Sequence, residues 1–260
     1  MLKGQNVLKQ KLARGETAVG MWITLESASI SEIAATLGYD WVVIDTEHGH
    51  LDFKEVVEHI RATRNSSTTP LVRVQEIEQG AIKRVLDLGA HGIIVPQVVD
   101  AAEVERSVQF AKYPPRGVRG VGGERATHWG MGLKERTESA DAETMVIPML
   151  ETVVAGEAIE DILDVPGVDA IFFGPADFSA SSGSLGEWEG PGVADRLLAL
   201  KETIEERGVA CGIMATDVEN ALLRQRQGFR MIGLGSDAGL LIRSSLDAMK
   251  ALGIAPVPRP

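Results

Sequence analysis

Eight short β-rich runs, separated by longer helical patterns, are the feature of the sequence that most constrains its fold. The runs span residues 18–23, 41–45, 70–74, 92–96, 145–150, 170–174, 209–214 and 231–235. Most are continuously apolar, as is typical of parallel strands that are buried on both faces. Eight such units in 260 residues predict an α/β fold, the (β/α)8 TIM barrel, which usually takes ~250 residues. A doubly wound sheet is disfavoured, because the segment MWITLESAS lacks the glycine-rich first turn of that fold.

The pattern contains no linker that would separate two domains, so residues 1–260 are expected to form a single barrel domain. The longest insertion runs from about residue 113 to about residue 141. It contains YPPRGVRGVGGERATHWG, whose proline and glycine content predicts an ordered loop rather than a helix. The last residues, 253–260, read GIAPVPRP and are expected to form an extended tail or an arm on a neighbouring subunit.

Composition excludes several classes of function. The net charge of −11 and the pI near 5.0 argue against nucleic acid or a membrane surface as partner, because phosphate contacts need clustered cations. The single cysteine, Cys211, excludes an intrachain disulfide and suits a reducing cytoplasm. Membrane-spanning runs of ~20 apolar residues and the apolar core of a signal peptide are both missing from the sequence. We therefore expect a soluble, cytoplasmic protein that acts on small molecules.

Polar residues gather where the predicted strands end. In a (β/α)8 barrel the carboxyl ends of the strands carry the chemistry, and the opposite ends carry stability. Five of the eight predicted strands deliver polar groups to this rim: Asp45, Glu47 and His48 after the second, Arg73 on the third, Gln97 after the fourth, Glu151 after the fifth and Asp177 after the sixth. This distribution predicts an active site at the carboxyl-end rim.

The two carboxylates of adjacent strands, Glu151 and Asp177, favour a hard divalent cation such as Mg²⁺ or Mn²⁺, which takes oxygen ligands and keeps positions open for water or substrate. The alternative is that Asp177 caps the helix that begins in DFSA. An imine mechanism is disfavoured, because the lysines fall in helical patterns, in loops or near the N-terminus rather than at strand ends.

His48 lies between acids at a strand end, where a carboxylate can orient one ring nitrogen and raise the basicity of the other, so we interpret it as a general base. A solvent-facing loop histidine and a zinc site of Glu47, His48 and His50 are the alternatives. Arg73 suits a substrate carboxylate or an enolate oxygen. The segment GLGSDAG, residues 233–239, is either a phosphate site or, preferably, a turn capped by Ser236 or Asp237.

The sequence resembles the HpcH/HpaI aldolase family over nearly its whole length. The resemblance is carried by WVVIDTEHG, PLVRV, IKRVLDLGAHGIIVP, YPPRGVRGVG, LETVVA and GVDAIFFGPADFSASSG. It implies a metal-dependent pyruvate aldolase with Mg²⁺, Mn²⁺ or Co²⁺ as cofactor. It also implies a homohexamer, a trimer of dimers with helices exchanged between subunits, in which Asp45 would serve across an interface.

By position, the resemblance implies that His48 is the catalytic base and that Asp87, in VLDLGA, raises its basicity. Arg73 matches the residue that stabilises the enolate, and Glu151 and Asp177 match the metal ligands. Backbone N–H groups of Ala176 and Asp177, in a motif that begins at Gly174, would hold the pyruvate carboxylate. From the residues themselves, we expect Asp45 and Glu47 to orient His48 and metal-bound waters.

One departure concerns the fifth strand, where the family usually reads Val-Gln-Ile-Glu with the glutamine on the substrate. This chain reads PMLE, with Met149 at that substrate-binding position, and Glu124 stands where small residues are commoner. Three hypotheses follow. The first is an aldolase that cleaves or forms 4-hydroxy-2-oxo acids. The second delivers the same enolate to another acceptor, as in a citrate-forming condensation or a decarboxylase. The third, a non-enzymatic binder of metal or oxo acid, is disfavoured because it would not need a base.

Overall fold

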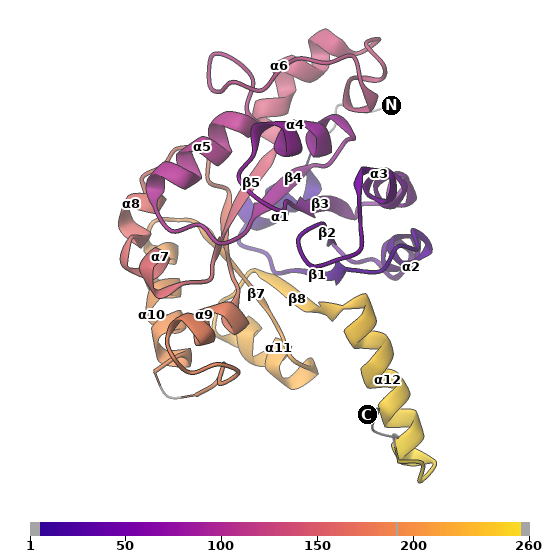
Figure 1. Ribbon diagram of the computed structural model, residues 1–260, viewed down its shortest axis with the longest axis vertical. Helices are drawn as coiled ribbons and strands as arrows, with labels where there is room; N and C mark the ends of the chain where they lie inside the picture. The colour runs from indigo at the N-terminus through magenta and orange to yellow at the C-terminus, as the bar shows by residue number, and fades with distance from the viewer. Residues whose placement is uncertain (1–5, 191, 256–260) are drawn as a thin grey trace.

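The computed structural model describes residues 6–190 and 192–255 and contains a closed barrel of eight parallel strands in sequential order (Figure 1). The barrel confirms the predicted fold. The strands are β1 (Ala18–Ile23), β2 (Trp41–Asp45), β3 (Thr69–Arg73), β4 (Gly92–Val95), β5 (Met145–Leu150), β6 (Ala170–Phe173), β7 (Ala210–Met214) and β8 (Met231–Ser236). Their bounds agree with the predicted runs to within one residue at each end.

Helices surround the barrel (Figure 1). They are α1 (Val7–Ala13), α2 (Ser29–Leu37), α3 (Phe53–Ala62), α4 (Gln79–Asp87), α5 (Ala101–Ala111), α6 (Leu133–Glu143), α7 (Val153–Glu157), α8 (Ile159–Leu163), α9 (Pro175–Ser181), α10 (Ala194–Glu206), α11 (Val218–Arg226) and α12 (Asp237–Ala251), with a short 3₁₀ turn, η1 (Arg125–Thr127). Across the described residues, none of these helices combines the length and apolarity that crossing a bilayer requires.

Alternation along the strands divides the core into two parts. In β2, Val42 and Ile44 pack outward against the helices, whereas Trp41 and Val43 pack inward with residues such as Phe172. Because side chains of a strand alternate between the two faces, the residue two positions after Val43 also points inward. That residue is Asp45, the last of β2. The pleat of the strands therefore aims the polar residues at the strand ends into the mouth of the barrel.

The amino end of the barrel is closed by α1. Leu8 and Leu12 belong to the same interior cluster as Trp41. Asn6 caps the helix by accepting a hydrogen bond from the Lys9 N–H at 3.0 Å. Its amide Nδ2 donates to the carbonyl oxygens of His91 (3.0 Å) and Glu143 (2.8 Å), which fastens the helix to the barrel. Access to the barrel interior is therefore confined to the opposite end.

One segment, in the insertion, differs from the sequence-based expectation. The insertion after α5 holds the predicted loop up to Gly130, but the helix α6 follows at Leu133. This helix, LKERTESADAE, is polar nearly all round and so lacks the apolar stripe by which helices are recognised. The expected tail is preceded by α12, which projects away from the barrel (Figure 1). Of that tail, residues 256–260 lie outside the described residues.

Candidate active site

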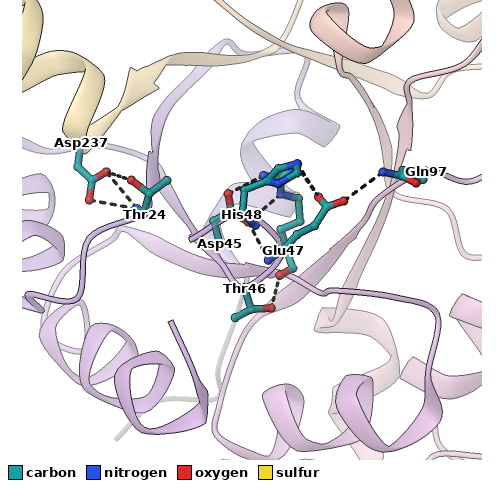
Figure 2. Close-up of polar contacts among 8 residues, drawn as sticks. Thr24, Asp45, Thr46, Glu47, His48, Gln97 and Asp237 are labelled. Atoms are coloured by element: carbon teal, nitrogen blue, oxygen red, sulfur yellow. Dashed lines mark hydrogen bonds and ion pairs between the residues drawn. The ribbon is translucent and has the colours of Figure 1, made fainter. Parts of the chain in front are cut away.

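The loop after β2 is shaped by its own backbone and by β3. The hydroxyl of Thr46 donates to the carbonyl oxygen of Arg73 at 2.6 Å, and the Thr46 N–H donates to the same oxygen at 3.1 Å. A Cβ at Gly49 would lie 2.3 Å from the carbonyl oxygen of Asp45, so this tight return of the chain requires glycine. The sequence DTEHG therefore folds back at the rim and presents Glu47 and His48 over the barrel mouth (Figure 2).

Asp45 and Arg73 form a buried ion pair because they are register partners at the ends of adjacent strands. Arg73 Nε lies 2.9 Å from Asp45 Oδ1 and Arg73 Nη2 lies 2.5 Å from Oδ2, a bidentate contact. The carboxyl side chain of Asp45 is 1% exposed. Within the single chain, Asp45 is therefore enclosed in the barrel and holds the guanidinium of Arg73.

Asp45 also holds the loop that carries the histidine. Its Oδ1 accepts hydrogen bonds from the backbone N–H groups of Glu47 (3.0 Å) and His48 (3.3 Å). The His48 side chain is 67% exposed, and its Nε2 lies 3.9 Å from Glu47 Oε2 (Figure 2). Asp45 thus orients the backbone at His48, whereas Glu47 is the carboxylate beside the ring. An imidazole that is exposed in this way can contact a small molecule that enters from solvent.

Glu47 connects the histidine to the arginine. Arg73 Nη1 lies 2.8 Å from Glu47 Oε2, and Gln97 Nε2 lies 3.5 Å from Glu47 Oε1. Burial raises the pKa of Glu47, and the charge of Arg73 opposes this shift. Arg73 donates hydrogen bonds to Asp45 through Nε and Nη2 and forms an ion pair with Glu47 through Nη1. Because a guanidinium has five N–H donors, the group retains donors for a substrate oxygen.

Glu151 follows β5 and is 2% exposed. The pKa of Glu151 is raised to about 7. Burial is the largest cause, the Gln97 N–H lowers the pKa, and the charges of Asp177 and Glu47 raise it. A Cβ at Gly174 would lie 2.5 Å from Glu151 Oε1, so only glycine at the end of β6 admits this carboxylate. Gly174 therefore contributes space beside Glu151.

Asp177 lies in the first turn of α9, which begins at Pro175 with Gly174 as the N-cap residue. The alternative in which Asp177 caps this helix is therefore wrong. Asp177 is exposed on the rim, close enough for its charge to raise the pKa of both Glu151 and Glu47. The backbone N–H groups at Ala176 and Asp177 belong to the helix start, where N–H groups have no intrahelical acceptor.

These residues fit a divalent cation. Within residues 6–190 and 192–255, no three His, Cys, Asp or Glu side chains form a metal-ligating cluster, so the zinc arrangement of Glu47, His48 and His50 is not formed. Two carboxylates are nevertheless sufficient for Mg²⁺, which usually keeps several waters and binds through one or two carboxylates plus substrate. Glu151 is a buried acid near the charge of Asp177. A cation held by both would offset the free-energy cost of burying the ionised carboxylate and the repulsion between the two charges.

Two expected site residues, Asp87 and Met149, do not lie at the rim beside His48. Asp87, the last residue of α4, pairs with Arg119 at 2.7 Å between Oδ1 and Nη2, so the single chain does not bring it to His48. Met149 is 3% exposed and packs inside the barrel with Trp22 and Phe172. It lies two residues before Glu151 on the same inward face, so it forms the floor below the carboxylate.

The segment GLGSDAG is not the predicted turn, because β8 ends at Ser236 and α12 begins at Asp237; the predicted cap at Ser236 is present. Ser236 is the N-cap of α12, and its hydroxyl accepts a hydrogen bond from the Gly239 N–H at 3.1 Å. Asp237 accepts hydrogen bonds from the N–H and hydroxyl groups of Thr24, at 3.0 Å and 2.7 Å to Oδ1 (Figure 2). The carboxylate thereby ties the start of α12 to the loop after β1.

Sequence reasoning missed two contacts of Arg73. Its guanidinium carbon lies 5.7 Å from the ring centroid of Trp22, inside the barrel. Its ion pair with Glu47 also went unrecognised, because a loop side chain can turn in several directions. The alternation of β1 and β2 could have predicted that Trp22 and Asp45 both point inward, toward Arg73.

Comparison with known proteins identifies the family to which this barrel belongs. A parallel barrel with carboxylates, an arginine and a histidine at its carboxyl-end rim is typical of enzymes rather than of binding modules. Residues 18–244 match the family model described as HpcH/HpaI aldolase/citrate lyase, and the chain belongs to this family. Its members named below include aldolases, which are carbon–carbon lyases.

Three similar proteins illustrate the range of the family. A hydroxypyruvate/pyruvate aldolase of Paraburkholderia phytofirmans is 34% identical over 252 residues, 94% of this chain and 96% of the relative. The crystal structure of an HpcH/HpaI aldolase/citrate lyase family protein from Burkholderia cenocepacia has a TM-score of 0.92 at 34% identity, covering 96% of this chain and all of that one. The structure of the citrate synthase SbnG has a TM-score of 0.85 at 33% identity, covering 96% and 99%.

Proposed function

We propose that the protein is a divalent-metal-dependent aldolase that cleaves or forms 4-hydroxy-2-oxo acids, giving pyruvate or a related 2-oxo acid plus an aldehyde. The observation that carries the proposal is the cluster of Glu151, Asp177 and Arg73 at one rim, with His48 exposed above it. The similarity to a hydroxypyruvate/pyruvate aldolase supports the same chemistry.

Glu151 and Asp177 would hold the cation, Mg²⁺, Mn²⁺ or Co²⁺. When bound, such an ion supplies Lewis-acid polarisation of the keto oxygen of a 2-oxo acid. The guanidinium N–H groups of Arg73 that its carboxylate partners leave available would donate to that oxygen as negative charge develops on it. The N–H groups at Ala176 and Asp177 would bind the substrate carboxylate at the start of α9.

His48 would act as the base in the cleavage direction. It would take the proton of the C4 hydroxyl, whose oxygen then forms the aldehyde C=O bond. The C3–C4 bond breaks, and its electron pair passes into the enolate that Arg73 stabilises. A proton delivered to C3 then gives pyruvate, and synthesis follows the reverse order. Glu47 beside the ring would stabilise the imidazolium that forms.

The experiment that tests this proposal is the cleavage of a 4-hydroxy-2-oxo acid, followed by pyruvate release. Activity should disappear in EDTA and return with Mg²⁺ or Mn²⁺. His48→Ala should lower kcat by about 10²-fold or more, the usual contribution of a general base. His50→Ala, in the same exposed loop, is the matched control and should leave kcat unchanged. Undiminished turnover of the His48→Ala protein would remove the base assignment.

The second candidate keeps the enolate and changes the acceptor. The similarity to the citrate synthase SbnG favours a citrate-forming condensation, and a decarboxylase belongs to the same class of enolate chemistry. Met149 is buried below Glu151, at the position where the resemblance implies a substrate-binding glutamine. Incubation with oxaloacetate and an acetyl thioester, whose acetyl group supplies the two added carbons of citrate, tests the condensation. Incubation with oxaloacetate alone, followed by carbon dioxide release, tests the decarboxylase.

We also propose that the protein assembles into a homohexamer. The apolar residues Leu241, Ile242, Leu246 and Leu252 of α12 and its end are exposed in the single chain, and α12 projects from the barrel (Figure 1). Burial of such a helix against another copy would remove this apolar surface from water. Light scattering coupled to size-exclusion chromatography measures the assembled mass, and a monomer would contradict the proposal.

A further inference from the structure

Gln97 has an unusual backbone conformation for its position. It follows β4 at the carboxyl-end rim and has φ +52°, in the left-handed region that non-glycine residues rarely adopt. Among the described residues, the other non-glycine cases are His128 and Trp129, in the insertion loop. The Gln97 side chain is exposed, so burial of apolar surface does not offset this strain.

The conformation directs the Gln97 N–H at a buried acid. This N–H lies 2.8 Å from Glu151 Oε2 and donates a hydrogen bond to it. The other oxygen, Oε1, faces Gly174 at the start of α9, the helix that carries Asp177. One oxygen of Glu151 is therefore held from the β4 side, and the other lies beside Gly174, at the start of the helix that carries Asp177.

The side chain of Gln97 reaches a second acid. Its Nε2 lies 3.5 Å from Glu47 Oε1, while Glu47 Oε2 lies 2.8 Å from Arg73 Nη1 (Figure 2). Gln97 is thus in contact with both Glu151 and Glu47. The charges of these two acids repel one another, and donors between them lower that repulsion.

We infer that Gln97 is a positioning residue, whose left-handed backbone aims its N–H at Glu151 Oε2 so that Oε1 is presented to a divalent cation beside Asp177. The inference rests on the proposed metal-dependent function. Residues that orient ligating carboxylates typically change metal affinity on the order of 10-fold to 100-fold when they are altered. The backbone, more than the amide, carries the effect, because the N–H contact is the shorter of the two.

The test measures Mn²⁺ affinity of the whole protein by electron paramagnetic resonance of free Mn²⁺. Gln97→Ile places a β-branched side chain where φ is positive, which such residues avoid, so the N–H should leave Glu151 and the affinity should fall about tenfold. Gln97→Gly keeps both the conformation and the N–H but removes the amide, and its affinity should stay within about threefold of the wild type. Gln97→Met removes the amide alone and should resemble Gln97→Gly if the strained backbone is retained.

Trp129→Ile is the matched control, because Trp129 is exposed and has φ +54° in the insertion loop. It imposes the same backbone conflict away from Glu151 and should leave Mn²⁺ affinity unchanged. Equal affinity of Gln97→Ile and the wild type would overturn the inference, as would an equal loss in Gln97→Ile and Trp129→Ile. Failure of the wild-type protein to bind Mn²⁺ would instead contradict the proposed function. Thermal unfolding of each variant verifies that the protein is folded.

Discussion

Both ends of the barrel contain acidic side chains. Those at the amino end are paired with cations, whereas Glu151 at the carboxyl end is not paired within the part of the chain that the structure describes. At the amino end, Asp40 lies 2.7 Å from Lys11 Nζ and accepts the Val19 N–H at 2.8 Å, and Asp169 is held in the same manner by Lys9 and the Val146 N–H. At the carboxyl end, Glu151 has a single backbone donor and lies near two further acids, which contribute to its raised pKa.

This difference indicates that the acids of the amino end stabilise the fold, whereas Glu151 at the carboxyl end is available to bind a ligand. Acids that are fully paired stabilise the fold and have little remaining capacity to bind a ligand. Glu151 costs free energy to ionise in the metal-free protein, and that cost would be relieved by a cation. The comparison makes the amino end a region where substitutions alter unfolding alone, and the carboxyl end a region where they alter ligand binding.

The largest predicted effect on stability concerns packing near the amino end. A Cβ at Gly20 would lie 2.0–2.4 Å from three ring atoms of Trp41, which begins β2. Gly20→Ala should therefore lower the free energy of unfolding by about 3 kcal/mol or more, measured by urea denaturation. Gly120→Ala, where the nearest atom is Lys83 Cδ at 3.5 Å, is the control and should change it by less than about 0.5 kcal/mol. Similar values for the two variants would contradict the packing account.

The next effect is a gain of stability at the carboxyl end. Burial raises the pKa of Glu151 to about 7 from an ordinary value of 4.5, so the folded state binds its proton more tightly than the unfolded state does. This group therefore favours folding below pH 4.5, and its contribution is lost as the pH rises through 7. In EDTA at pH 8, Glu151→Gln should raise the free energy of unfolding by about 2 kcal/mol.

The pH dependence provides the control for this gain. The advantage of the Glu151→Gln protein should shrink toward zero when urea denaturation is repeated near pH 4.5, where the native glutamic acid is protonated. A variant that is less stable than the wild type at pH 8 would show that Glu151 is adequately paired without a cation, and the contrast between the two ends would be lost.

The smallest predicted effect on stability concerns Asn6, which caps α1. Asn6 is buried and its side chain makes three hydrogen bonds, to Lys9, His91 and Glu143. Asn6→Ala should lower the free energy of unfolding by about 1–2 kcal/mol, because it removes a helix cap and leaves two carbonyl oxygens without this donor. Mn²⁺ affinity should be unchanged, and Asn65→Ala at an exposed position is the control. Weaker Mn²⁺ binding by Asn6→Ala would mean that the two ends are coupled.

Most of the fold could be predicted from the sequence, because eight continuously apolar runs separated by helical patterns leave few arrangements. The alternation of side-chain direction along a strand determines that Asp45 and Arg73 point into the barrel. Their pairing was not predicted, since it depends on strand register. The helix α6 was missed because its sequence is polar on every side, and residues 233–239, interpreted as a turn, are instead the end of β8 and the start of α12.

The sequence predicted which residues lie at the rim better than it predicted which residues contact one another. Glu151 and Asp177 lie at the same rim, as their strand-end positions indicated. The partner of the His48 ring could not be derived, because loop side chains turn toward whichever charge the fold brings near. In the structure that partner is Glu47, while Asp87 pairs with Arg119. The left-handed backbone of Gln97 leaves no signal in the sequence, since glutamine is not a residue that favours it.

The central claim is that the carboxyl-end rim stabilises an enolate. Its most direct test is the exchange of pyruvate methyl protons in heavy water, followed by NMR, because this needs no knowledge of the aldehyde. We predict exchange with Mg²⁺ or Mn²⁺, none in EDTA, and a loss of about 10³-fold or more in Glu151→Gln, as expected when a metal ligand that stabilises transition-state charge is removed. Exchange that persists in EDTA or in Glu151→Gln would contradict the account.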